Sequence, residues 1–117
     1  MEELKYYECV VQLYRDKYYS TTIKLSTNTY QLDFRYNTFS ESYYLTVYDS
    51  VGNPIAVNKE IAADRFFTFN VSENGAVQLA IYFGKYLETL SVDPENWTDN
   101  MFCVARLIKW EKIIVED

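Results

Sequence analysis

Residues Tyr30–Ile55 read YQLDFRYNTFSESYYLTVYDSVGNPI and decide the fold. The first part alternates apolar and polar side chains with the period of two that is typical of a half-buried strand. The apolar set is Tyr30, Leu32, Phe34 and Tyr36, and the polar set is Gln31, Asp33, Arg35 and Asn37. A polar turn follows, then a second alternating segment, YYLTVYD, in which we expect Leu45 and Val47 to point inward. The stretch therefore predicts a β-hairpin whose second strand ends at the glycine turn at 49–54.

Segments of the same kind flank this hairpin. The tail, MFCVARLIKWEKIIVE, fits either a helix or a strand, and its β-branched content favours a strand. The other expected strands are 7–14, 21–25, 30–36, 43–48, 55–57, 67–71 and 77–83. About eight short antiparallel strands with no linker or repeat predict one all-β domain over residues 1–117, either a β-sandwich or a small β-barrel. The pattern does not choose between these two.

Composition supports this interpretation and limits the partners. Aromatic residues make up 18% of the chain, which favours sheet, and only 3 Gly and 2 Pro leave most turns to Asn, Asp, Ser and Thr. The net charge of −6 would repel a phosphate backbone, so we expect no nucleic-acid partner. The N-terminal residues resemble no signal peptide and no apolar run is long enough to span a membrane. We expect synthesis in a cytoplasm, without an export signal, and no membrane contact.

The sequence lacks the residue types on which most enzyme mechanisms depend. The chain contains no histidine, which removes histidine-based catalytic dyads and metal sites, and two cysteines cannot form a structural zinc site. Cys9 and Cys103 are expected to be buried free thiols, although a disulfide between them stays open. Asp93, Glu95 and Asp99 could hold calcium, but their spacing favours an ordinary acidic loop. We therefore expect no enzyme activity, no metal and no cofactor.

Tyrosines supply the candidate binding residues. If Leu45 and Val47 point inward, Tyr44 and Tyr48 point outward, and Tyr18 and Tyr19 lie beside a polar turn. Tyrosine buries a large area while keeping a polar tip, so an outward tyrosine face indicates a protein interface at Tyr18, Tyr19, Tyr44 and Tyr48. The alternative is that both faces of these strands are covered within the chain.

The hairpin also carries a family resemblance. The segments Phe34–Asn37 (FRYN), Tyr44–Asp49 (YLTVYD) and Gly52–Ile55 (GNPI) resemble the hairpin of small phage tail proteins described as baseplate plugs of contractile-tailed phages. The resemblance covers about Tyr30–Ile61. It implies a β-rich virion component that packs against other tail or baseplate proteins and has no catalytic role. A homo-oligomer is one form this association could take.

A second hypothesis belongs to a different class. A carbohydrate-binding or host-surface-binding β-sandwich would use exposed aromatic rings, and Trp97 and Trp110 would then stack on sugars.

Overall fold

The computed structural model describes residues 2–72, 76–85, 94 and 97–112. Most of these residues form strands, and one short segment forms a helix. The strands are β1 Glu2–Val11, β2 Tyr18–Leu25, β3 Asn28–Asn37, β4 Ser42–Tyr48, β5 Pro54–Glu60, β6 Arg65–Asn70, β7 Val77–Lys85 and β8 Met101–Lys112, and the helix is α1 Trp97–Asn100. The prediction of an all-β fold is confirmed. In the tail, Met101–Lys112 form a strand, as the β-branched content predicted, and residues 113–116 lie outside the described residues.

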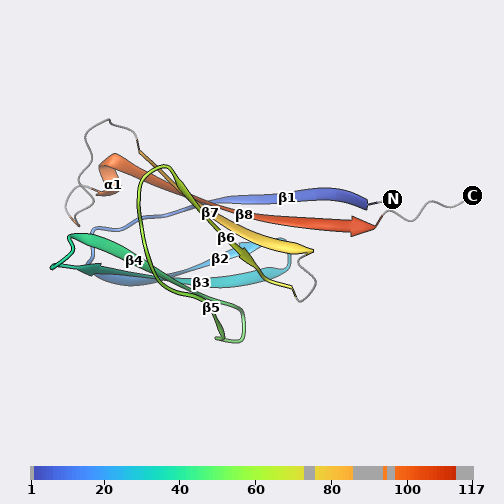
Figure 1. Ribbon diagram of the computed structural model, residues 1–117, viewed down its shortest axis with the longest axis horizontal. Coiled ribbons are helices and arrows are strands. Elements are labelled where there is room, and N and C mark those ends of the chain that lie inside the picture. The colour runs from blue at the N-terminus through green and yellow to red at the C-terminus, as the bar shows by residue number, and fades with distance from the viewer. Residues whose placement is uncertain (1, 73–75, 86–93, 95–96, 113–117) are drawn as a thin grey trace, which may run out of the picture.

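The strands form two four-stranded antiparallel sheets. Sheet 1 has the order β1-β8-β7-β6, and sheet 2 is a meander of consecutive strands, β2-β3-β4-β5. Figure 1 shows the sheets as two facing layers, with β5 leading by a loop from sheet 2 up to β6 in sheet 1. Because the two sheets stay separate, the fold is a sandwich and not a closed barrel. The first and last strands lie side by side, with Glu2 opposite Lys112 and Val11 opposite Cys103.

Alternation in the sequence matches burial in both layers. In β3 and β4 the inward set is fully or almost fully buried, as the hairpin pattern predicted: Tyr30, Leu32, Phe34, Tyr43, Leu45 and Val47. Sheet 1 supplies the other half of the core through Leu79, Ile81 and Phe83 of β7 and Met101, Cys103, Ala105 and Leu107 of β8. Burying one apolar face of each sheet against the other removes this surface from water and drives the two layers together.

Polar residues make the turns in this glycine-poor chain. Ser26, Glu41 and Asp64, which lie between strands, have positive φ angles, a conformation that glycine usually supplies, and Asn58 adopts it within β5. In the turn between β4 and β5, Asp49 Oδ1 accepts hydrogen bonds from the backbone N–H groups of Val51 and Asn53, and Gly52 has a φ of 89°. The side chain of Asp49 therefore organises a turn that the sequence predicted from DSVGNP.

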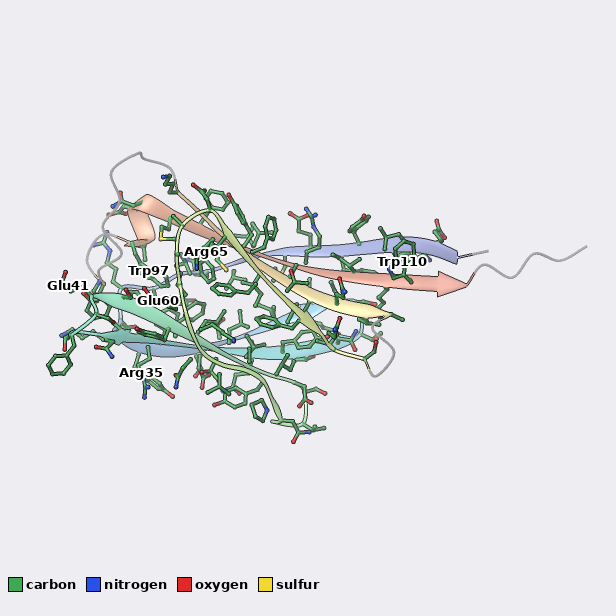
Figure 2. All side chains as sticks on the ribbon, in the orientation of Figure 1. Arg35, Glu41, Glu60, Arg65, Trp97 and Trp110 are labelled. Atoms are coloured by element: carbon green, nitrogen blue, oxygen red, sulfur yellow. The ribbon has the colours of Figure 1, made fainter. Side chains whose placement is uncertain are left out.

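Aromatic rings fill the core at the end of the sandwich where α1 lies, and Figure 2 marks Trp97 there. Trp97 stacks on Tyr43 with ring centroids 3.9 Å apart and lies edge-on to Phe34 at 5.7 Å. Its indole Nε1–H donates a hydrogen bond of 2.7 Å to the carbonyl oxygen of Tyr14. The Tyr43 hydroxyl donates in the same way to the carbonyl oxygen of Asp16. The segment between β1 and β2 is thus bonded to a core aromatic of α1 and to one of sheet 2.

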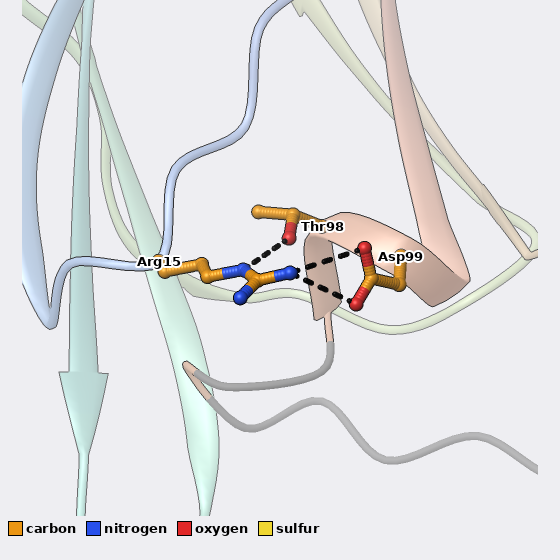
Figure 3. Close-up of polar contacts among 3 residues, drawn as sticks. All are labelled: Arg15, Thr98 and Asp99. Carbon is orange, nitrogen blue, oxygen red and sulfur yellow. Dashed lines mark hydrogen bonds and ion pairs between the residues drawn. The ribbon is translucent and has the colours of Figure 1, made fainter.

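An exposed ion pair joins the same segment to α1 from outside (Figure 3). Arg15 Nη2 donates to both carboxylate oxygens of Asp99 at 3.3 and 3.1 Å, and Arg15 Nε donates to Thr98 Oγ1 at 3.3 Å. Both charged side chains are more than half exposed, so this contact orients the segment and adds little stability.

Candidate interaction surfaces

The described residues gather no cluster suited to catalysis or metal binding. Among them, no polar or charged residue is buried, and no three His, Cys, Asp or Glu side chains lie close enough together to hold a metal ion. Of the three carboxylates considered for calcium, Asp93 and Glu95 lie outside the described residues. The third, Asp99, is engaged by Arg15. No helix in the described part of the chain is long and apolar enough to cross a membrane.

The two tryptophans considered as sugar platforms lie in different environments. Trp97 is fully buried, so the expectation that it stacks on a sugar is wrong. The polar sequence around Trp97 predicts a surface loop. In the structure the indole ring enters the core because α1 directs it inward. Trp110 is exposed at the opposite end of sheet 1 (Figure 2). Of the two tryptophans, only Trp110 is therefore available to stack on a sugar, together with exposed tyrosines.

Both cysteines are free. Cys103 is buried and Cys9 is half-buried, on neighbouring strands of sheet 1. Burial raises the pKa of the Cys103 thiol far above its ordinary value, and burial together with the charge of Glu8 raises the pKa of Cys9. Thiols held protonated in this way are poor nucleophiles, so they act as small packing residues.

The outer face of sheet 2 carries three of the four tyrosines expected at an interface. Tyr18 is well exposed, and Tyr44 and Tyr48 are partly exposed on the same face. Together with Arg35, which Figure 2 shows pointing away from the core, they border a shallow hollow of about 230 Å³. Other residues lining this hollow are Asp33, Thr46, Val57 and Asn58. This surface, the tyrosine face, is aromatic but rich in hydrogen-bonding groups.

Tyr19 is not part of that face. Its ring stacks on the buried Phe34 at 4.9 Å and meets Tyr14 edge-on at 5.2 Å. Its hydroxyl accepts a hydrogen bond from the backbone N–H of Tyr14, and burial raises its pKa far above the ordinary value. Adjacent residues of a strand point to opposite faces, so Tyr18 and Tyr19 cannot both be outward.

A second aromatic surface, which the sequence interpretation missed, covers the outer face of sheet 1. Strand register places its side chains on one face, and ring contacts join Phe66 to Tyr82 and Tyr82 to Phe102. The apolar members are Leu4, Tyr6 and Val10 of β1, Phe66 of β6, Ala80 and Tyr82 of β7, and Phe102, Val104, Ile108 and Trp110 of β8. We call this surface the apolar face. It surrounds a hollow of about 310 Å³ over Ala80.

A further hollow is an open, mainly polar groove at the end of the sandwich near the turns. It measures about 650 Å³ and is lined by residues of three turns, from Thr27 to Tyr30, from Asp49 to Ile55, and from Asn70 to Ser72. Tyr30 is almost fully buried beneath it, and burial together with Asp49 raises its pKa. Without an exposed aromatic ring in its lining, this groove offers no stacking surface for a ligand.

The fold and its surfaces define a class of protein: a small antiparallel β-sandwich with two aromatic outer faces. The profile of the cyanophage baseplate Pam3 plug gp18 family matches residues 6–96, and the chain therefore belongs to this family. No curated protein and no solved structure matches the chain. The match extends well beyond Tyr30–Ile61, where the resemblance was visible. It identifies a structural component of a phage baseplate and places it in the virion.

Proposed function

We propose that this chain is a non-enzymatic subunit of a phage or prophage tail baseplate that acts through contacts with other baseplate proteins. The family match over residues 6–96 is the observation that carries this proposal. The surfaces agree with it, because the described side chains concentrate aromatic rings on the outer faces rather than in a ligand cleft.

The tyrosine face is the proposed contact with other baseplate proteins. Its three rings lie among polar groups that already form hydrogen bonds, such as Ser20 Oγ to Asp33 Oδ1 at 2.6 Å and Tyr44 Oη to Ser40 Oγ at 3.2 Å. Interfaces between proteins that also exist separately combine tyrosine and arginine with many polar contacts. Tyr18, Tyr44, Tyr48 and Arg35 supply this combination.

Charge and composition restrict the partners further. A chain with a net charge of −6 is repelled by nucleic acid and by anionic membrane surfaces, so the proposed partners are proteins alone. The proposal includes synthesis in the cytoplasm of the bacterial host, without export, before assembly into the particle.

Incorporation into particles tests the proposal. A combined variant, Tyr18→Ser with Tyr44→Ser and Tyr48→Ser, would replace the chain in the phage that encodes it, and mass spectrometry would measure the amount per purified particle. We expect a fall of about tenfold or more, equivalent to about 1.4 kcal/mol of binding free energy. Val51→Ser, at an exposed turn between β4 and β5, is the control and should be incorporated normally. Unchanged incorporation of the triple variant would remove the tyrosine face from the proposal, and absence of the wild-type chain from particles would overturn it.

A further inference from the structure

The apolar face exposes several large apolar side chains to water. Phe66, Tyr6 and Trp110 are each more than half exposed on it, and Val10 is 78% exposed. Contiguous apolar surface of this kind marks a contact with another molecule. Interfaces of permanent homodimers are more apolar than those of proteins that exist separately, which distinguishes this face from the polar tyrosine face.

The charge on this face is balanced within the chain. Glu8 and Arg106 form a charged pair on this face, and Arg106 Nη2 donates to Glu8 Oε2 at 3.2 Å. Strand register places one further pair of opposite sign, Glu2 and Lys112, at the end of the same two strands. The Arg106 guanidinium also lies over the ring of Tyr6 at 5.6 Å. Although the whole chain carries −6, two copies meeting here would bring no net charge into the interface. This neutrality removes the repulsion that two acidic chains would otherwise experience.

The same pair has the arrangement that a twofold axis requires. Strand register places Glu8 of the edge strand β1 directly opposite Arg106 of β8. A twofold axis parallel to the strands, passing between Glu8 and Arg106, exchanges the two ends of the pair, so that Glu8 of each copy faces Arg106 of the other. The four charges then alternate in sign, which is favourable electrostatic complementarity.

The shape of the face is also self-complementary. The hollow over Ala80 is walled by Phe66, Tyr82, Phe102, Val104 and the Glu8–Arg106 pair. Val10 and Tyr6 project from the same face along β1, the edge strand. In a twofold arrangement each copy offers both a hollow and projecting side chains, as an isologous interface needs.

We propose that a second copy of this chain covers the β1 and β8 part of the apolar face, forming a face-to-face twofold dimer centred on the Glu8–Arg106 pair. This proposal does not depend on the baseplate assignment, since it rests on the face alone.

Sedimentation equilibrium of the full chain measures the dimer from about 1 to about 100 μM, a range that brackets micromolar dissociation constants. We expect a mass of twice 13.9 kDa at the upper end. Val10→Glu, on β1, should raise the dissociation constant at least about tenfold, because each copy would bury an unpaired charge. Val51→Glu, which adds the same charge at a similarly exposed valine in the turn between β4 and β5, should leave the dimer intact.

A charge-reversal mixture tests the geometry. Glu8→Arg leaves two positive charges in place of the ion pair and Arg106→Glu leaves two negative charges, so each variant alone should be monomeric. Mixed in equal amounts, they should form a heterodimer, since like pairs are then replaced by opposite ones. Circular dichroism and thermal unfolding check that each variant is folded. A monomeric wild type, a larger wild-type assembly, or variants that dimerise alone and gain nothing from mixing would each overturn the proposal.

Discussion

Trp97 and Tyr43 stack with their ring centroids 3.9 Å apart and their planes 10° apart, and both rings are fully buried. Trp97 follows a polar stretch of the chain, whereas Tyr43 belongs to a central strand of sheet 2. Each also bonds to the backbone of the segment between β1 and β2, through the carbonyl oxygens of Tyr14 and Asp16. The stack therefore connects three parts of the chain that are distant in sequence.

Replacing Trp97 with alanine should destabilise the fold by about 3 to 5 kcal/mol, because a large buried ring leaves a cavity and the Tyr14 carbonyl loses its donor. Tyr43→Phe keeps the stack and removes only the hydrogen bond to Asp16, so its cost should be about 1 kcal/mol. Urea unfolding of both variants gives the comparison. Equal losses from the two substitutions would contradict the central packing role of Trp97.

The Arg15–Asp99 pair should contribute little by comparison. Its side chains are 65% and 64% exposed, and exposed ion pairs are worth up to about 1 kcal/mol. A double-mutant cycle with Arg15→Met and Asp99→Asn measures the coupling free energy in urea. The coupling should shrink in high salt, because ions screen exposed charges. A coupling above about 2 kcal/mol would show that the pair does more than orient the segment.

Stability should fall as pH rises above about 9 to 10. The folded state raises the pKa of Cys103 above its ordinary 9.0 and the pKa of Tyr19 above 10.0, in both cases mainly by burial. The unfolded chain therefore loses these protons first, and rising pH favours unfolding. Below the ordinary pKa values both groups are protonated in either state and the full stability is present.

Urea unfolding between pH 7 and pH 11 measures this slope. Cys103→Ala and Tyr19→Phe should each flatten the alkaline part of the curve, whatever they do to stability at pH 7. If the slope is unchanged in both variants, other groups must be responsible for the alkaline loss.

Gly84 leaves room for Phe102 on the apolar face. A Cβ atom at Gly84 would lie 2.2 Å from Phe102 Cζ, so Gly84→Ala must push the ring aside. We expect a loss of about 1 to 3 kcal/mol, as for other overpacked sites. Adding Phe102→Leu, which shortens the obstructing side chain, should recover part of it. Thermal unfolding of the two single variants and the double variant decides this, and strictly additive losses would argue against the steric explanation.

The hairpin could be predicted from sequence because its two faces differ in polarity. In Tyr30–Tyr36 only one face is apolar, so Leu32 and Phe34 had to point inward. The turn at Asp49 was equally readable, since Asp, Gly, Asn and Pro each favour a turn by their own chemistry.

The apolar face could not be predicted because both faces of β8 are apolar. Cys103 and Ala105 point inward, while Phe102, Val104 and Ile108 are only partly buried on the outside, and alternation gives no way to separate the two sets. The pairing of β1 with β8, which completes this face, joins the first and last strands. No short stretch of the sequence indicates a pairing between segments so far apart. Trp97 was misassigned for a related reason, because its environment depends on distant Tyr14 and Tyr43.

Cross-linking mass spectrometry on purified particles of the phage that encodes this chain tests the baseplate role most directly. The account predicts that the chain is present in the particle and that lysines on sheet 2, such as the exposed Lys24, cross-link to other baseplate proteins. Particles that assemble complete tails without the chain, or cross-links only to proteins outside the baseplate, would contradict it.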